Sequence, residues 1–270
     1  MATLLSMIQA GQKPVVGMVQ LNALPTGSQY RGQGFDEVLA AAMAEARILS
    51  DNGVEVLMIQ NLGDIPVALE VTREQVAWMT RITAEVKSQF GRSVGLNMLE
   101  NDAAAMMAVA SASGADFVRI KIYVGAMMTP FGMETAKAHE AIKARNALGA
   151  QGVAIFADVH DRTGTPMSSG GFVEDVEFAV RLGGADGLVI TGKSYDDTLS
   201  MLRAARTKYS SVPLLVGGGV TKDNFNEIAA IANGAIVSTS LKDTGSAVGR
   251  FVPQKVKEFM AVAKGKRADL

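Results

Sequence analysis

Short apolar runs alternate with longer amphipathic segments along the whole chain. The runs are rich in Val, Ile and Leu and end at Gly, Pro or polar residues, as expected for parallel strands that are buried on both faces. This pattern predicts strands at 15–21, 54–60, 93–99, 117–123, 153–160, 187–191, 212–216 and 235–239. Apolar residues at helical spacing predict helices at 35–50, from 72 onward, and at 102–113, 136–148, 172–182, 195–209, 221–233 and 253–264. Thr72, Asp102 and Thr221 stand where they can cap three of these helices.

The predicted strands and helices form eight successive pairs, which repeat about every 30 residues. Alternating strands and helices require a parallel sheet, and eight such pairs close a (β/α)8 TIM barrel. We therefore expect residues 1–270 to form one α/β barrel domain, with a short helix at about 1–12 before the first strand. An open, doubly wound sheet is the alternative, but no Gly-x-Gly-x-x-Gly motif follows the first strand.

The overall charge gives no reason to expect a polyanionic partner. Lys and Arg total 26 and Asp and Glu total 27, so the net charge of −1 favours neither nucleic acid nor an anionic membrane. The absence of cysteine excludes disulfides, thiolate catalysis and thiolate metal sites. No apolar run approaches the roughly 20 residues that cross a bilayer, and the first residues lack the pattern of a signal peptide. We expect a soluble, cytoplasmic protein.

Charged residues occupy inward positions on two predicted strands. Within 117–123, apolar residues alternate with Arg119, Lys121 and Tyr123, and because the apolar set must face the helices, the two cations point into the barrel. Within 153–160, the same reasoning turns Asp158 inward beside these cations and brings His160 to the rim. A buried charge is costly unless it is paired or meets a ligand. The arrangement therefore indicates either structural ion pairs or a site for an anionic substrate.

Polar residues also stand at the ends of the first three predicted strands. Gln20 ends the first, Gln60 and Asn61 come at the end of the second, and Asn97 takes an inward position on the third. The active sites of TIM barrels lie at this carboxyl-terminal face. We therefore expect Gln20, Asn61 and Asn97 to contact a ligand.

No spacing motif in the chain requires a cofactor. We assign none with certainty, and we keep open a divalent metal held by Asp158, His160 and a carboxylate such as Glu100 or Asp64, since Mg²⁺ and similar ions prefer such ligands.

A triple glycine follows the seventh predicted strand. Gly217, Gly218 and Gly219 free backbone amides there, and Thr239 and Ser240 end the eighth strand. In TIM barrels, the loops after strands seven and eight are the usual phosphate site. These five residues predict a phosphate site, although three glycines can also serve only to make a tight turn.

Several segments together resemble one known family. They are 13–21 (KPVVGMVQL), 24–27 (LPTG), 61–66 (NLGDIP), 95–102 (GLNMLEND), 156–159 (FADV), 190–192 (ITG), 215–221 (LVGGGVT) and 239–242 (TSLK). The chain resembles the BtpA/SgcQ family along nearly its whole length. The resemblance implies a TIM barrel of the ribulose-phosphate-binding type, and it adds Thr191 and Gly192 to the expected substrate-binding residues. The first two strands of that family usually end in His and in Glu-Asn, where this chain has Gln20 and Gln60.

Two functions are consistent with the sequence. In the first, the chain is a lyase, isomerase, epimerase or glycosyl-bond-cleaving enzyme of sugar or nucleoside catabolism that acts on a small phosphorylated compound. Asp158 would then be a general acid or base, with Asn97 and His160 nearby, while Arg119 and Lys121 hold an anionic intermediate or Lys121 forms a Schiff base. In the second, the barrel is a non-catalytic assembly or phosphate-sensing protein. For either function we expect a homo-oligomer.

Overall fold

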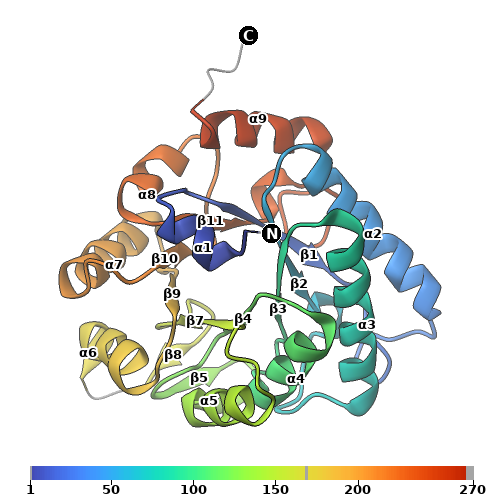
Figure 1. Cartoon of the computed structure of the whole chain (residues 1–270), viewed down its shortest axis with the longest axis horizontal. Helices are drawn as coiled ribbons and strands as arrows, with labels where there is room; N and C mark the ends of the chain where they lie inside the picture. Colours follow the sequence, from blue (N-terminus) through green and yellow to red (C-terminus); the bar gives the residue numbers. More distant parts are fainter. Residues whose placement is uncertain (1, 168–169, 266–270) are drawn as a thin grey trace.

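Eight parallel strands close into a barrel in the computed structural model, which describes residues 2–167 and 170–265 (Figure 1). The order around the barrel is β1, β2, β3, β4, β7, β9, β10 and β11, and β11 pairs with β1 to complete the circle. The TIM-barrel prediction is therefore confirmed, and only residues 1, 168–169 and 266–270 of the expected domain lie outside the described residues. The barrel strands are β1 (Val15–Gln20), β2 (Val56–Gln60), β3 (Ser93–Asn97), β4 (Phe117–Ile120), β7 (Ala154–Asp158), β9 (Gly187–Ile190), β10 (Leu214–Val216) and β11 (Gly234–Val237).

Helices surround the barrel and bury their apolar faces against the outside of the strands (Figure 1). They are α2 (Phe35–Asp51), α3 (Arg73–Phe90), α4 (Ala103–Ser113), α5 (Ala138–Ala147), α6 (Gly171–Glu177), α7 (Tyr195–Lys208), α8 (Phe225–Ile231) and α9 (Pro253–Ala263). A π-helical turn at Phe178–Leu182 continues α6, and short 3-10 helices follow β2 at Leu62–Asp64 and β11 at Thr239–Leu241. Thr72 caps α3 in a capping box with Gln75 and Asp102 caps α4, as expected. Thr221 caps no helix, because α8 begins four residues later with Asn224 at its N-cap position.

The inside of the barrel is a second apolar core, which α1 (Leu4–Gln9) closes from below. Leu4 and Ile8 are buried against barrel residues from several strands, and Figure 1 shows α1 lying across the near end of the barrel. The rings of Phe117 and Phe156 meet edge to face in this core, with centroids 5.7 Å apart. Glycines on the neighbouring strands make room for both rings. A Cβ on Gly95 would lie 2.4 Å from the Phe117 ring, and one on Gly187 would lie 2.4 Å from the Phe156 ring.

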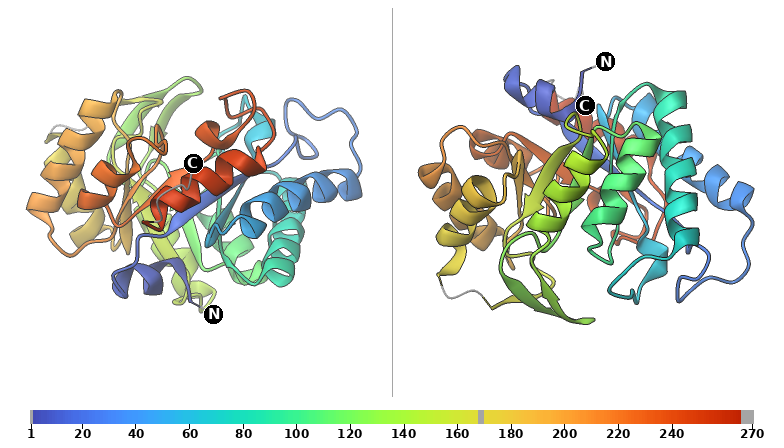
Figure 2. Two further views of the ribbon diagram at one scale, coloured as in Figure 1. Left: turned by 90° about the horizontal axis from the view of Figure 1, so that it is seen from above. Right: turned by 60° about the horizontal axis from the view of Figure 1, so that its bottom comes forward.

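A small antiparallel sheet projects beyond the carboxyl ends of the barrel strands, and the sequence pattern did not predict it. It consists of β5 (Ala126–Thr129), β6 (Gly132–Thr135) and β8 (Thr165–Pro166), with β5 in the middle. In the right-hand view of Figure 2 the β5–β6 hairpin lies at the bottom of the molecule, on the opposite side from α1. Strands of four residues on either side of Pro130 carry too little periodicity to be recognised in the sequence.

Six of the eight barrel strands end one to three residues earlier than predicted, and after β4 and β7 this changes where the following residues point. β4 ends at Ile120, and Tyr123, expected on the inward face, is buried among the outer helices with its hydroxyl donating to the carbonyl of Gly183. β7 ends at Asp158, and His160 has a left-handed backbone with φ of 58°. The inward alternation therefore stops at Arg119 and Asp158.

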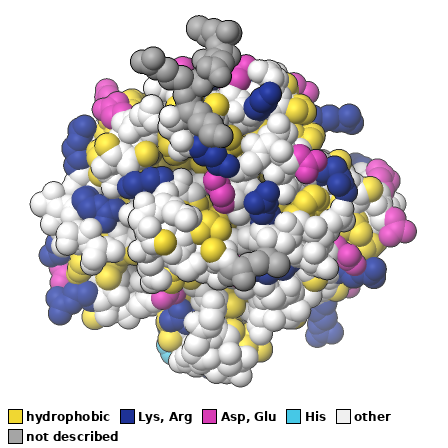
Figure 3. Space-filling model, turned by 45° about the horizontal axis from the view of Figure 1, so that its top comes forward, with side chains coloured by type: hydrophobic (Ala, Val, Ile, Leu, Met, Phe, Trp, Pro, Cys, Tyr) yellow, Lys and Arg dark blue, Asp and Glu magenta, His cyan; other side chains and the backbone are white. Residues whose placement is uncertain are grey.

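The surface has no long-range charge pattern on the face seen in Figure 3, where Lys and Arg side chains are interspersed with Asp and Glu. Among residues 2–167 and 170–265, no helix has both the length and the hydropathy needed to span a membrane.

The tight fit around the Phe117 ring leads to a stability prediction. Gly95→Ala adds a methyl group that would overlap this ring, so the free energy of unfolding should fall by about 1–3 kcal/mol, the usual cost of overpacking a core. Urea denaturation measures the loss. The control is Gly152→Ala, where the added Cβ meets no atom within 4 Å; equal stability of the two variants would contradict the packing described above.

Candidate active site

A layer of polar residues covers the apolar core at the carboxyl ends of the eight strands. Side chains alternate along a strand, so the residue two positions after each inner core residue also points inward. On seven strands that core residue is a large apolar side chain, and on β3 it is Gly95, whose space the Phe117 ring fills. The residues of this upper layer are Gln20, Gln60, Asn97, Arg119, Asp158, Thr191, Gly217 and Ser238.

Arg119 and Asp158 form a buried, two-bonded ion pair in this layer. The Arg119 Nε atom lies 2.8 Å from Asp158 Oδ2, and Nη2 lies 2.7 Å from Oδ1. Burial alone would lower the pKa of Arg119, but the charge and hydrogen bonds of Asp158 raise it, so the guanidinium stays charged. The sequence predicted this contact. Because both carboxylate oxygens of Asp158 are occupied by Arg119, the pair presents mainly the guanidinium to the mouth.

A chain of hydrogen bonds runs from the ion pair across the mouth. Asn97 donates to the carbonyl of Arg119 at 2.9 Å and accepts from Gln60 at 2.7 Å. Gln20 in turn donates to Gln60 at 3.2 Å and accepts from the ammonium of Lys242 at 2.8 Å. Asn97 is fully buried and both ends of its amide are occupied, so it supports the mouth and does not itself face a ligand.

Lys121 lies just beyond β4 and faces the mouth. Its Nζ atom is 3.7 Å from Asp161 Oδ1 and 3.2 Å from the Thr163 hydroxyl. Burial works to raise the pKa of Asp161, but the charges of Lys121 and Arg119 outweigh it and lower that pKa, so Asp161 is ionised. Two cations thus meet two carboxylates here. Sequence reasoning missed Asp161, although it stands directly after the predicted strand at 153–160.

A cavity of about 300 Å³ lies above this layer and reaches the loops after β10 and β11. Gly218, Gly219 and Thr239 line it. In the described part of the chain, the backbone N–H groups of these three residues and of Ser240 have no intramolecular acceptor. Four of the five residues predicted for the phosphate site therefore line one cavity: Gly217, Gly218, Gly219 and Thr239. Gly217 also belongs to the upper layer, where its missing side chain leaves room for Arg119 and Thr191.

Arg162 was not predicted, yet it lies over the loop after β10 that contains Gly217, Gly218 and Gly219, called the glycine loop below. A Cβ built on Gly218 would lie 3.2 Å from Arg162 Nη2, so the guanidinium covers the loop at the edge of the cavity. It follows Asp161 in the loop after β7, and this pair of charged residues, next to the predicted strand at 153–160, was the available signal.

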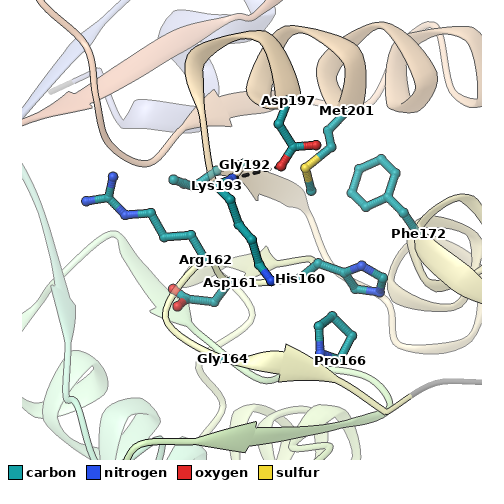
Figure 4. Close-up of a pocket in the computed structure, with 11 residues that line it drawn as sticks. His160, Asp161, Arg162, Gly164, Pro166, Phe172, Gly192, Lys193, Asp197 and Met201 are labelled. Atoms are coloured by element: carbon teal, nitrogen blue, oxygen red, sulfur yellow. Dashed lines mark hydrogen bonds between the residues drawn. The ribbon is translucent and has the colours of Figure 1, made fainter.

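His160 does not join the Asp158 group. Its Nε2 atom lies 2.7 Å from Asp175 Oδ2 on α6, and its ring packs edge to face with Phe172. It lines a second cavity of about 200 Å³ between the ends of β7 and β9, the side pocket drawn in Figure 4. The prediction of His160 at the rim holds, but its side chain faces the side pocket.

The remaining predicted residues divide between the two cavities and the supporting structure. Thr191 lines the side pocket with its hydroxyl buried and without a partner in the described residues. The amide of Gly192 donates to the Thr198 hydroxyl, which fixes the start of α7. The hydroxyl of Ser240 donates to the carbonyl of Val220 and so ties the two phosphate-site loops together.

Asn61 was predicted to contact a ligand, but it is fully buried beneath the loop after β2. Its amide donates to Asp64 and Glu100, and Gln75 donates to both carboxylates as well. Burial raises the pKa of Asp64 and of Glu100 because only neutral amides compensate their charges, and each carboxylate also faces the other. Asp64 and Glu100 are thus in a different cluster from Asp158 and His160. Within residues 2–167 and 170–265, no three acidic or His side chains are arranged to hold a metal ion.

Comparison with known proteins gives a consistent family and fold. The profile described as the BtpA family matches residues 11–265. The photosystem I biogenesis protein BtpA of Synechocystis is 32% identical over 256 residues, which cover 93% of this chain and 88% of that protein. The sgc region protein SgcQ of Escherichia coli is 26% identical over 253 residues, covering 92% and 93%.

Several solved structures share the fold of this chain. The native KDPGal structure has a TM-score of 0.57 at 16% identity and covers 93% of this chain and 95% of its own. N-(5'-phosphoribosyl)anthranilate isomerase from Pyrococcus furiosus has a TM-score of 0.55 at 14% identity and covers 94% and 100%. At this identity the likeness concerns the fold alone.

The buried carboxylates Asp64 and Glu100 lead to a prediction about pH. A raised carboxyl pKa means that the folded chain keeps a proton which the unfolded chain has released, so the free energy of unfolding falls as pH rises from about 4 through the raised pKa. Glu100→Gln removes one of these protons and should reduce that fall. Urea midpoints between about pH 4 and pH 8 measure it. The control is Glu85→Gln on the exposed face of α3; the same pH slope in both variants would contradict the assignment.

Proposed function

The chain belongs to the BtpA family, and we propose that it is an enzyme that acts on a small phosphorylated compound at the carboxyl-terminal mouth of its barrel. The observation that carries the proposal is the convergence of two kinds of group on one cavity. Free backbone amides of the loops after β10 and β11 border it, and so do Arg119 and Lys121.

The amides of Gly218, Gly219, Thr239 and Ser240 suit a phosphate. They belong to two successive strand–helix loops, and Thr239 and Ser240 begin a 3-10 helix whose first N–H groups are open. Such amides attract anions through their partial positive charge, and barrels of this kind hold phosphates at these two loops. Arg162 beside Gly218 adds a full positive charge.

Lys121 and Arg119 suit the reacting end of the ligand. Both line the cavity, and Asp158 and Asp161 hold them in position. Cations that face a ligand stabilise negative charge, so we favour a lyase, isomerase or epimerase with an anionic enediolate-like intermediate over cleavage of a glycosyl bond. In this proposal Lys121 contacts the substrate. Asp158 orients Arg119, and its use as an acid or base would require one of the two Arg119 bonds to open.

A second candidate is a protein that binds a phosphorylated ligand without converting it. It is favoured by the name of the Synechocystis relative, which describes biogenesis of photosystem I and no reaction. The same cavity would serve both functions, so turnover of a bound ligand decides between them.

We predict that the protein is stabilised by phosphorylated sugars in a thermal-shift screen, performed with and without added Mg²⁺. A ligand at 100 times its dissociation constant adds about 2.7 kcal/mol to the free energy of unfolding. Gly218→Asp should abolish the shift, because the new carboxylate repels the phosphate and lies against Arg162. Gly152→Asp, far from the mouth and unhindered, is the control. Full ligand affinity in Gly218→Asp would locate the phosphate elsewhere.

We predict that Lys121→Met folds but loses turnover by about 100-fold or more on the compound that the screen identifies. Asp161 keeps Arg119 at 4.0 Å and the Thr163 hydroxyl as partners, so loss of the lysine charge should be tolerated. If Lys121 only balanced buried charge, its loss would instead cost roughly 3–5 kcal/mol and leave activity intact. Lys143→Met on α5 is the control.

Borohydride trapping on the wild type then separates a Schiff base on Lys121 from an electrostatic role.

A further inference from the structure

The side pocket adjoins the mouth and differs from it in chemistry. Asp161 and Arg162 line both cavities, so the two adjoin at these side chains. Phe172, Pro166 and Met201 form an apolar side of the pocket, and Figure 4 shows Lys193 extending across it toward His160 and Asp161.

The carboxylates that line the side pocket, and Asp175 beside it, already have partners. Asp161 is matched by Lys121, and Asp175 by the imidazole of His160. Asp197 accepts the backbone N–H of Lys193 at 2.8 Å, the contact drawn as a dashed line in Figure 4. None of the three carboxylates is paired with Arg162 or with the ammonium of Lys193.

The two cations of the pocket, in contrast, are unpaired. Across residues 2–167 and 170–265, no carboxylate oxygen lies within 4.0 Å of the Arg162 guanidinium or the Lys193 ammonium. Two cations that border one cavity and lack acidic partners attract an anionic group of a ligand.

One further hydrogen-bonding group lines the pocket. Asp175 binds Nε2 of His160, and Nδ1 of this imidazole makes no hydrogen bond within the described residues. A hydroxyl group of a ligand satisfies such a position, because it both donates and accepts.

We infer that the side pocket is a second subsite, which binds the carboxylate end of a phosphorylated sugar acid whose phosphate lies at the glycine loop. The inference rests on the proposed function and extends it to a substrate class. Arg162 lies between the two acidic groups, Lys193 contacts the carboxylate, and His160 meets a hydroxyl beside it.

The test compares two ligands that differ only at the end away from the phosphate. 6-Phosphogluconate carries a carboxylate at that end, and sorbitol 6-phosphate carries an alcohol. Isothermal titration should show 6-phosphogluconate binding about tenfold more tightly or better, as expected for charge-assisted hydrogen bonds. Lys193→Met should remove this preference and leave the affinity for sorbitol 6-phosphate unchanged. Lys143→Met is the control.

Each other outcome overturns a defined part of the inference. Equal affinity of the wild type for both ligands would refute the carboxylate subsite while leaving the phosphate site intact. A preference that survives in Lys193→Met would refute the assignment of the carboxylate to this pocket. Binding of neither ligand would refute the phosphate site, and with it the inference. Gly218→Asp should lower the affinity for both ligands equally, because both carry the phosphate. This variant therefore tests the phosphate site separately from the carboxylate subsite.

Discussion

The ion pair of Arg119 and Asp158 is the constraint on which the mouth of this barrel depends. Two charges inside a barrel are stable only if both are bound and the polar groups around them are also satisfied. Asn97 holds the backbone of Arg119, Gln60 holds Asn97, and Gln20 connects them to Lys242. The pair therefore fixes a continuous polar layer above the apolar core, and this layer is the floor of the candidate active site.

This layer determines which polar groups support the site and which are open to a ligand. Asn97 and Gln60 bind their neighbours through both the carbonyl and the amino group of their amides, so these side chains hold the floor in place. The groups left open lie in the loops above the floor, where Lys121, Arg162 and the glycine amides border the cavity. Rigid strand ends that carry variable loops suit one barrel to many reactions, which is why membership of the BtpA family and a shared fold do not name the substrate.

Much of this arrangement could be predicted from the sequence, since alternation along a parallel strand is a strict geometric rule. It predicted the barrel and the contact of Asp158 with Arg119, while the triple glycine marked the loop that borders the cavity. The rule fails two or three residues beyond a strand end. His160 turns away because its backbone is left-handed, and Tyr123 packs outward because β4 stops at Ile120. Lys242 and Arg162 reach the mouth from loops, where side-chain direction has no period to predict it.

The small helix α1 beneath the barrel has a consequence for how the chain is made. Leu4 and Ile8 pack with residues from both early and late strands, including Ile236 on β11. The segment that carries α1 is synthesised before any strand, but its docking surface is complete only after the last strand has joined β1. Its apolar residues therefore stay exposed until nearly the whole barrel has been translated. Such a long delay between synthesis and burial exposes a nascent chain to aggregation and favours assistance by chaperones.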